Sequence, residues 1–194
     1  MTPSRALIVW DRRLLGVQPA GNEVVAVDQW TSIDQIIHWI GWKSDQYRGD
    51  VVLRVLAHGF HFDTGRAGPD GKHVFSPGGG GIQVGREGIT LSTVQKFAAL
   101  RGKLRKIELL GCAAAYITPG FEGREGDGNF LCYRLAQIAQ TYVKASTADQ
   151  SYESDRYSWH AWGLFPDKPI DFGPWEGTVI TYGPTGGRAG LPWE

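Results

Sequence analysis

The sequence predicts an α/β protein with a mostly parallel central sheet flanked by helices. Up to residue 149, short apolar runs that favour strands alternate with segments whose apolar residues recur at helical spacing. This alternation is typical of βαβ units, in which consecutive strands run parallel in one sheet. At 194 residues the chain is expected to form a single domain over 1–194.

Six strands are predicted from short apolar runs. They are expected at residues 6–10, 23–28, 50–57, 107–112, 141–146 and 178–182. The first run is continuously apolar, which is typical of a strand buried on both faces. The last run lies where the alternation of strands and helices has ended. Residues 150–194 are therefore expected to form a C-terminal layer of loops and one strand within the same domain.

Three helices are predicted between these strands. The first begins after Ser32 and runs to about residue 47, because Gln35 completes a capping box with Ser32. Two further helices are expected over 90–100 and 129–140, each with apolar residues on one face. Both would cover the sheet.

Two Gly-rich segments are predicted to be long loops that follow strands. Residues 59–88 are expected to form a loop with a short hairpin at 82–89, and residues 113–127 a mobile loop. Loops of this length inside a compact domain are usually functional or disordered.

Charge and composition exclude several classes of protein. The chain has 20 basic and 20 acidic residues without a run of about five like charges, so a nucleic-acid partner is not expected. An apolar stretch of about 18 residues, as a membrane span requires, does not occur. The apolar run that ends at Trp10 is too short for a signal peptide. A cytoplasmic protein, or an effector delivered without a signal peptide, is therefore expected.

A histidine and a cysteine each follow a predicted strand. His58-Gly59 follows the strand at 50–57, and Gly111-Cys112 ends the strand at 107–112, a separation of 112 − 58 = 54 residues. Sites in open α/β sheets form at the carboxyl ends of strands, so the two side chains are expected to meet. A neighbouring imidazole turns a thiol into a nucleophile. Taken singly, such a histidine or cysteine is more often structural.

The other candidate residues fit weaker patterns. His58, His61, Asp63 and His73 suggest a metal site, but their spacing matches no standard zinc pattern. No metal and no cofactor are therefore expected. Cys132 lies in a predicted helix and is expected in the core. Two cysteines are not a disulfide framework, and they favour a reducing compartment.

With these residues in place, the chain from 51 to 149 resembles the caspase-like superfamily of cysteine peptidases, in a pattern most like its bacterial CHAT-type members. The resemblance rests on the strand before His58-Gly59, the strand before Gly111-Cys112-Ala113, and the helices and strand around them. It implies a caspase-like three-layer sandwich with a mostly parallel central sheet flanked by helices. Ala113-Ala114 stands where caspases place Arg-Gly or a close variant, so the caspase preference for aspartate at P1 is not implied.

The resemblance also implies roles for individual residues. Cys112 would attack a peptide carbonyl, His58 would protonate the leaving amine, and the backbone N–H groups of Gly59 and Cys112 would stabilise the oxyanion. In clostripain-like and gingipain-like relatives an acidic side chain at such a strand end selects arginine or lysine. Asp149 is the candidate for that role. The slightly favoured alternative is that Asp149 is an exposed turn residue without a role in binding. With a basic P1, Arg124 would be a self-cleavage point, unless its loop serves as a substrate gate.

Two main classes of function remain open, with a third beside them. The first is a cysteine endopeptidase that cleaves a peptide or protein substrate. The second is a catalytically inert or regulated caspase-like module that binds another protein. Another thiol-dependent acyl transfer or hydrolysis is a third option, because a His/Cys dyad does not name the bond it breaks. The sequence predicts neither an oligomeric state nor an activator.

Overall fold

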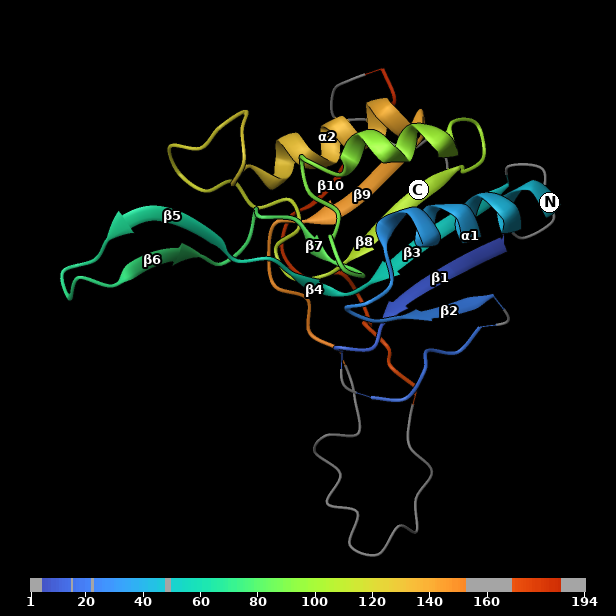
Figure 1. Ribbon diagram of the computed structural model, residues 1–194, viewed down its shortest axis with the longest axis horizontal. Coiled ribbons are helices and arrows are strands. Elements are labelled where there is room, and N and C mark those ends of the chain that lie inside the picture. The colour runs from blue at the N-terminus through green and yellow to red at the C-terminus, as the bar shows by residue number, and fades with distance from the viewer. Residues whose placement is uncertain (1–4, 15, 22, 48–49, 153–168, 186–194) are drawn as a thin grey trace, which may run out of the picture.

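A six-stranded sheet forms the centre of the computed structural model, which describes residues 5–14, 16–21, 23–47, 50–152 and 169–185. Its strands are β1 (Arg5–Asp11), β2 (Val24–Val27), β3 (Val51–Leu56), β8 (Lys106–Leu110), β9 (Tyr142–Ser146) and β10 (Val179–Tyr182). Their order is β10-β9-β8-β3-β1-β2 (Figure 1). Only β10 runs antiparallel to its neighbour in this sheet. The predicted α/β class with a mostly parallel sheet is confirmed.

Within the described residues, two α-helices and one 3₁₀ helix accompany the sheet: α1 (Ile33–Gln46), η1 (Val94–Leu100) and α2 (Gly128–Ala139). The capping box predicted for α1 is present, because Ser32 Oγ accepts from Gln35 N and Ser32 N donates to Gln35 Oε1. Helix α2 begins one residue earlier than predicted, after the N-cap Asp127, whose Oδ1 accepts from Phe130 N at 2.9 Å.

The helix expected over 90–100 is wrong in type and in its start. Residues 90–93 form a turn, and the 3₁₀ helix η1 follows. Thr93 Oγ1 accepts from Thr90 N at 2.9 Å and donates to Gly88 O at 2.8 Å. Hydroxyls that bond the nearby backbone in this way stabilise turns at the expense of an α-helix.

The main hydrophobic core lies between the helices and one face of the sheet (Figure 1). The central strands contribute alternate, odd-numbered residues to it: Leu7 and Val9, Leu53 and Val55, and Ile107 and Leu109. Phe97 of η1 and the isoleucines of α1 pack against them. Burying each such side chain contributes about 1.5–3 kcal/mol, so this layer attaches the helices to the sheet.

The opposite face of the sheet is covered differently. Its smaller apolar cluster contains Ile8, Trp10, Leu14, Leu56, Ile170 and Phe172. Within the described ranges the segment 169–175, which contains no helix, crosses this face beside Leu14, Pro19 and Ala20 of the loop after β1. We call this segment the strap. Of the C-terminal layer expected at 150–194, the strap and β10 are described, and 153–168 and 186–194 lie outside the described residues.

Charged residues stand among the apolar ones on this second face. Glu108 is buried, and it pairs with Lys106 Nζ at 2.7 Å and with Arg54 Nε at 2.9 Å. Burial raises the pKa of Glu108, but the hydrogen bonds and charges of Lys106 and Arg54 outweigh this effect and hold the pKa below its ordinary value of 4.5. Glu108 is therefore an ionised carboxylate between two cations at neutral pH.

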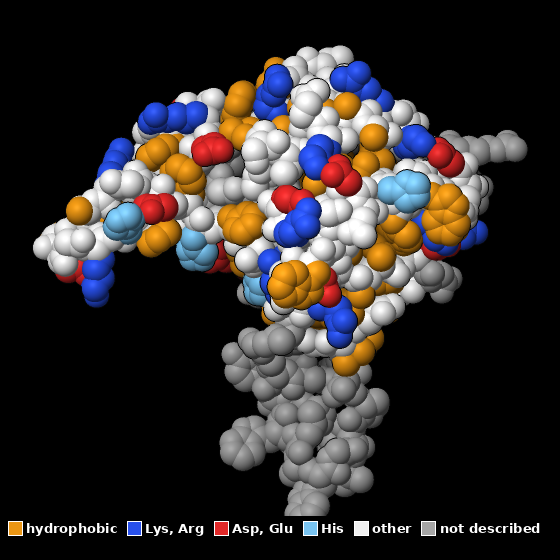
Figure 2. Space-filling view, viewed as in Figure 1, with side chains coloured by type: hydrophobic (Ala, Val, Ile, Leu, Met, Phe, Trp, Pro, Cys, Tyr) orange, Lys and Arg blue, Asp and Glu red, His pale blue; other side chains and the backbone are white. Residues whose placement is uncertain are grey.

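The long loop after β3 contains more structure than expected. β4 (His58–Gly59) pairs with β7 (Ile82–Gln83), and Ile82 also bridges to Ile89 as the predicted hairpin requires. Between them, β5 (Phe62–Ala67) and β6 (His73–Ser76) form an unforeseen hairpin arm. The arm stands out from the body of the molecule and exposes hydrophobic side chains (Figures 1 and 2). Among the helices described, none is long and apolar enough to cross a bilayer.

The variant Glu108→Gln is expected to lower the free energy of unfolding by about 1–2 kcal/mol at pH 7, because Arg54 and Lys106 lose the carboxylate between them. The pKa of Glu108 is depressed in the folded chain. Its contribution is therefore complete above the unfolded pKa and is lost as the pH falls through the folded pKa. Urea unfolding of wild type and variant from pH 7 to pH 3 should show a shrinking difference. A difference that grows in acid would contradict this assignment.

Candidate active site

The register of β3 against β8 brings His58 and Cys112 to the same level. Five consecutive pairs, ending at Leu56 and Leu110, keep an offset of 110 − 56 = 54 residues. The ladder continues past the strands, because Ala57 N donates to Leu110 O at 3.3 Å. His58 and Cys112 are separated by the same 54 residues, and each stands two residues beyond the last pair, so they follow the carboxyl ends of adjacent strands.

The backbones at these strand ends are in close contact. A Cβ atom added to Gly59 would lie 2.0 Å from the carbonyl oxygen of Cys112. Since that distance is far below van der Waals contact, only glycine fits at position 59 without movement of the chain. The segment that contains His58 is thereby held directly against the segment that contains Cys112.

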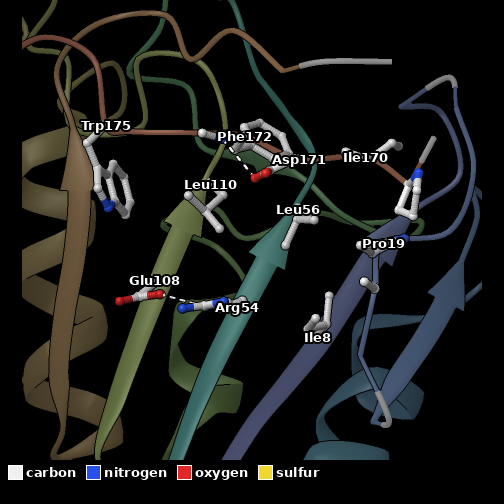
Figure 3. Close-up of a pocket in the computed structure, with 13 residues that line it drawn as sticks. Ile8, Pro19, Arg54, Leu56, Glu108, Leu110, Ile170, Asp171, Phe172 and Trp175 are labelled. Atoms are coloured by element: carbon white, nitrogen blue, oxygen red, sulfur yellow. Dashed lines mark hydrogen bonds and ion pairs between the residues drawn. The ribbon is translucent and has the colours of Figure 1, made fainter. Parts of the chain in front are cut away.

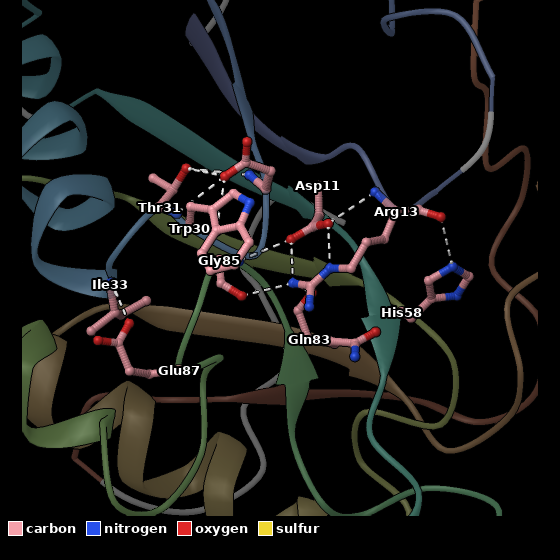
Figure 4. Close-up of polar contacts among 10 residues, drawn as sticks. Asp11, Arg13, Trp30, Thr31, Ile33, His58, Gln83, Gly85 and Glu87 are labelled. Carbon is pink, nitrogen blue, oxygen red and sulfur yellow. Dashed lines mark hydrogen bonds and ion pairs between the residues drawn. The ribbon is translucent and has the colours of Figure 1, made fainter.

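His58 is half-buried, and a backbone carbonyl holds its ring. Nε2 lies 3.3 Å from the carbonyl oxygen of Arg13, in the loop that follows β1 (Figure 4). A carbonyl oxygen only accepts hydrogen bonds, so this contact requires the proton on Nε2. In the neutral imidazole, Nδ1 is then the nitrogen that can accept a proton.

A buried ion pair holds Arg13 itself in place. Asp11, the last residue of β1, is fully buried, and its carboxylate accepts from Arg13 Nε at 2.8 Å and from Arg13 Nη2 at 2.6 Å. Arg13 also donates to the carbonyls of Gln83 and Gly85 (Figure 4). The hydrogen bond with Asp11 raises the pKa of Arg13 against the opposing effect of burial. The pair ties the end of β1 to the segment after β7, and it orders the carbonyl that contacts His58.

Sequence reasoning missed this pair. The available signal was a carboxylate at the end of an apolar run, with an arginine two residues later. A charged group at the end of a buried strand needs a partner, and one of the two arginines that follow it, Arg12 or Arg13, could have been assigned to it.

Cys112 lies in the turn after β8 and is half-buried. Its thiol donates to the carbonyl oxygen of Gln150 at 3.7 Å, in the segment after β9. The side chain of the buried Gln150 is held in turn by the backbone of Glu176, at 3.1 Å to N and 3.0 Å to O. In the part of the chain that the structure describes, no hydrogen bond joins Cys112 to His58. Each group contacts a backbone carbonyl instead.

Asp149 follows the end of β9 and lies beside the Cys112 turn. Ala113 N donates to Ala148 O at 2.9 Å, and Gln150 O contacts the Cys112 thiol, so both chain neighbours of Asp149 contact this turn. Asp149 is exposed. Its side chain is therefore open to solvent.

Cys132 differs from Cys112 in its surroundings. It is fully buried in α2, and burial, with a smaller effect of Asp127, raises its pKa. Its thiol contacts Ala114 O. Cys132 therefore stays protonated and inaccessible at neutral pH.

The residues considered as metal ligands do not gather. Asp63 Oδ2 contacts His73 Nδ1 at 2.7 Å across the hairpin arm, and that contact lowers the pKa of Asp63. His58 faces the Arg13 carbonyl instead. Across the described residues, no three His, Cys, Asp or Glu side chains form a group able to hold a metal ion.

Comparisons of the chain with protein-family models, with curated proteins and with solved structures find no match.

Iodoacetamide is expected to alkylate Cys112 in the folded protein and to leave Cys132 unmodified, because only Cys112 is accessible. Mass spectrometry of tryptic peptides after timed labelling measures both sites. The Cys112→Ala variant is the control and should take up no label until it is unfolded in urea. Equal labelling of both cysteines in native wild type would contradict the burial of Cys132.

The variant Asp11→Asn is expected to lower the free energy of unfolding by about 3 kcal/mol, because the guanidinium of Arg13 loses its buried partner. The matched control is Asp45→Asn, which removes an exposed pair with Lys103 and should cost less than about 1 kcal/mol. Urea unfolding monitored by circular dichroism compares the two. Equal losses would show that the Asp11–Arg13 pair behaves as a surface ion pair.

Proposed function

We propose that the chain is a cysteine endopeptidase of caspase-like architecture, with Cys112 as the nucleophile and His58 as the general base and acid. The proposal rests on one observation, the shared 54-residue offset that aligns His58 and Cys112 at the ends of adjacent parallel strands. The mostly parallel sheet and the location of both groups at the carboxyl edge support it.

The tautomer of His58 suits the proposed chemistry. With Nε2–H donated to the Arg13 carbonyl, Nδ1 takes the thiol proton, and the thiolate of Cys112 attacks the peptide carbonyl carbon. The resulting imidazolium gives its proton to the departing amine, which leaves a thioester on Cys112. Water, deprotonated by His58, then hydrolyses the thioester and restores the thiol and the neutral imidazole.

The remaining requirement is stabilisation of the oxyanion, and the close approach of the two backbones supports it. The N–H groups of Gly59 and Cys112 are the proposed donors to the oxyanion, and donors of this kind contribute about 3–4 kcal/mol of transition-state stabilisation. A side chain at position 59 would collide with the backbone of residue 112. The glycine therefore serves the geometry of the pair as well as access for a substrate.

The proposed substrate is a peptide or protein with a basic P1 residue. Asp149 is exposed beside the Cys112 turn, where its carboxylate can pair with an arginine or lysine side chain. Arg124 is exposed in the loop after β8, which makes that loop the proposed point of self-processing. Both cysteines are free thiols, in keeping with a proposed cytoplasmic or effector location.

A second candidate is a catalytically inert or regulated module that binds another protein. The observation that favours it is that Cys112 and His58 bond to the carbonyls of Gln150 and Arg13 and not to each other. Catalytic hydrogen bonds are often long in a free enzyme and shorten only when a substrate binds, so activity distinguishes the two candidates.

A mixed-sequence peptide library, read by mass spectrometry with and without calcium, tests the proposal. Wild type and Cys132→Ala are expected to cut after arginine or lysine. Cys112→Ala and His58→Ala are expected to lose activity by at least about 100-fold while keeping the unfolding transition of wild type. Asp149→Asn should weaken cleavage after basic residues selectively. Cleavage that persists in Cys112→Ala, or no cleavage by folded wild type with or without calcium, would favour the binding module.

A further inference from the structure

A cavity of about 540 Å³ lies on the face of the sheet that the helices do not cover (Figure 3). Its floor is made by even-numbered residues of three central strands: Ile8, Arg54, Leu56, Glu108 and Leu110. The strap crosses above it with Ile170, Phe172 and Trp175. The cavity shares β3 and β8 with the candidate active site, but neither His58 nor Cys112 lines it.

The chemistry of the cavity is uneven. Near the strap its walls are aliphatic and aromatic, formed by Leu56, Leu110 and Phe172. Two residues earlier in β3 and β8, the charged pair Arg54–Glu108 stands in place of apolar side chains (Figure 3). When protein covers both faces of a parallel sheet, the central strands are usually apolar on both faces. The charges on this face therefore indicate a chamber with room for water or a ligand.

Arg54 can bind an additional group. Glu108 occupies only its Nε, and in the described part of the chain its two terminal nitrogens have no hydrogen-bond partner. The side chain is 49% exposed. The planar guanidinium therefore presents free N–H donors at the polar end of the cavity, and such donors match the geometry of a carboxylate.

The charge balance at this end favours an anion. Glu108 already pairs with two cations, Lys106 and Arg54, so the cluster retains a surplus positive charge. On the rim, Asp171 accepts from Gly173 N and is exposed to solvent, where its charge is screened. A cationic ligand would meet a carboxylate that is already neutralised, whereas an anionic one meets an available guanidinium.

We propose that this cavity binds a small amphipathic carboxylate. The alkyl or aryl part lies beneath the strap against Leu56, Leu110 and Phe172, and the carboxylate accepts from the terminal nitrogens of Arg54. The cavity volume falls within the range of about 300–1,000 Å³ that ligand pockets occupy. This site does not depend on the proposed peptidase activity, and its test leaves that activity aside.

Calorimetric titration of the full chain with octanoate, octan-1-ol and octylamine tests the ligand class, because the three probes share an alkyl chain and differ in charge. Octanoate is expected to bind and to raise the unfolding temperature, and the alcohol and the amine to bind at least about tenfold more weakly. Equal affinity for all three, or no binding of octanoate at millimolar concentration, would overturn the proposal.

Two variants locate the site. Arg54→Met should weaken octanoate at least about tenfold and leave the alcohol unchanged. Ala20→Trp places a bulky side chain at the exposed rim of the cavity and should abolish binding of every probe without involving the Arg54–Glu108 pair. The matched control is Arg66→Met on the hairpin arm, which should bind octanoate like wild type. Unchanged octanoate affinity in Arg54→Met or in Ala20→Trp would overturn the assignment.

Discussion

Pairing between β3 and β8 keeps one offset over five residue pairs, and both the candidate active site and the cavity depend on that register. At the carboxyl ends it aligns His58 with Cys112. Two and four residues earlier it aligns Leu56 with Leu110 and Arg54 with Glu108. A slip of one residue in either strand would turn Arg54 or Glu108 toward the helices, where its charge would be buried without its partner. The apolar residues on the helix side therefore hold the register on which the opposite face depends.

The two faces of the sheet serve different purposes. On one face, alternate apolar residues attach α1, η1 and α2 through a continuous core. On the other face, the strap covers only part of the sheet, and charged residues stand where aliphatic ones would pack. Stability thus comes mainly from the first face, and the second has room for binding. Both faces meet at the carboxyl edge, where the loops after β1, β3, β8 and β9 converge.

Much of the fold follows from local patterns in the chain. All six strands of the sheet were predicted within a few residues of their observed bounds, because short apolar runs bounded by turns or by helical segments indicate strands. The capping box at Ser32 and Gln35 is a contact between near neighbours in sequence and was predicted with its partners. The α-helical prediction for η1 was wrong because the spacing of apolar residues does not indicate the hydroxyl contacts of Thr93.

The hairpin arm and the Asp11–Arg13 pair were not foreseen, for different reasons. The residues of β5 and β6 are mostly exposed and polar, so they show no alternation that would predict strands. The pair at the end of β1 is joined to Gln83 and Gly85, some 70 residues away in sequence. No pattern within β1 indicates that neighbour.

The amino-acid sequence by itself determined the class of fold and the location of a histidine and a cysteine at strand ends, because periodicity and strand boundaries are local properties. Tertiary structure decided what surrounds those two groups: a carbonyl of Arg13 on His58, a carbonyl of Gln150 on Cys112, and a cavity beneath the strap. The two hydrogen bonds join residues that are 45 and 38 positions apart in the sequence. Only the packing of the sheet brings such residues together, since hydrogen-bond partners and cavity walls depend on distance in space and not along the chain.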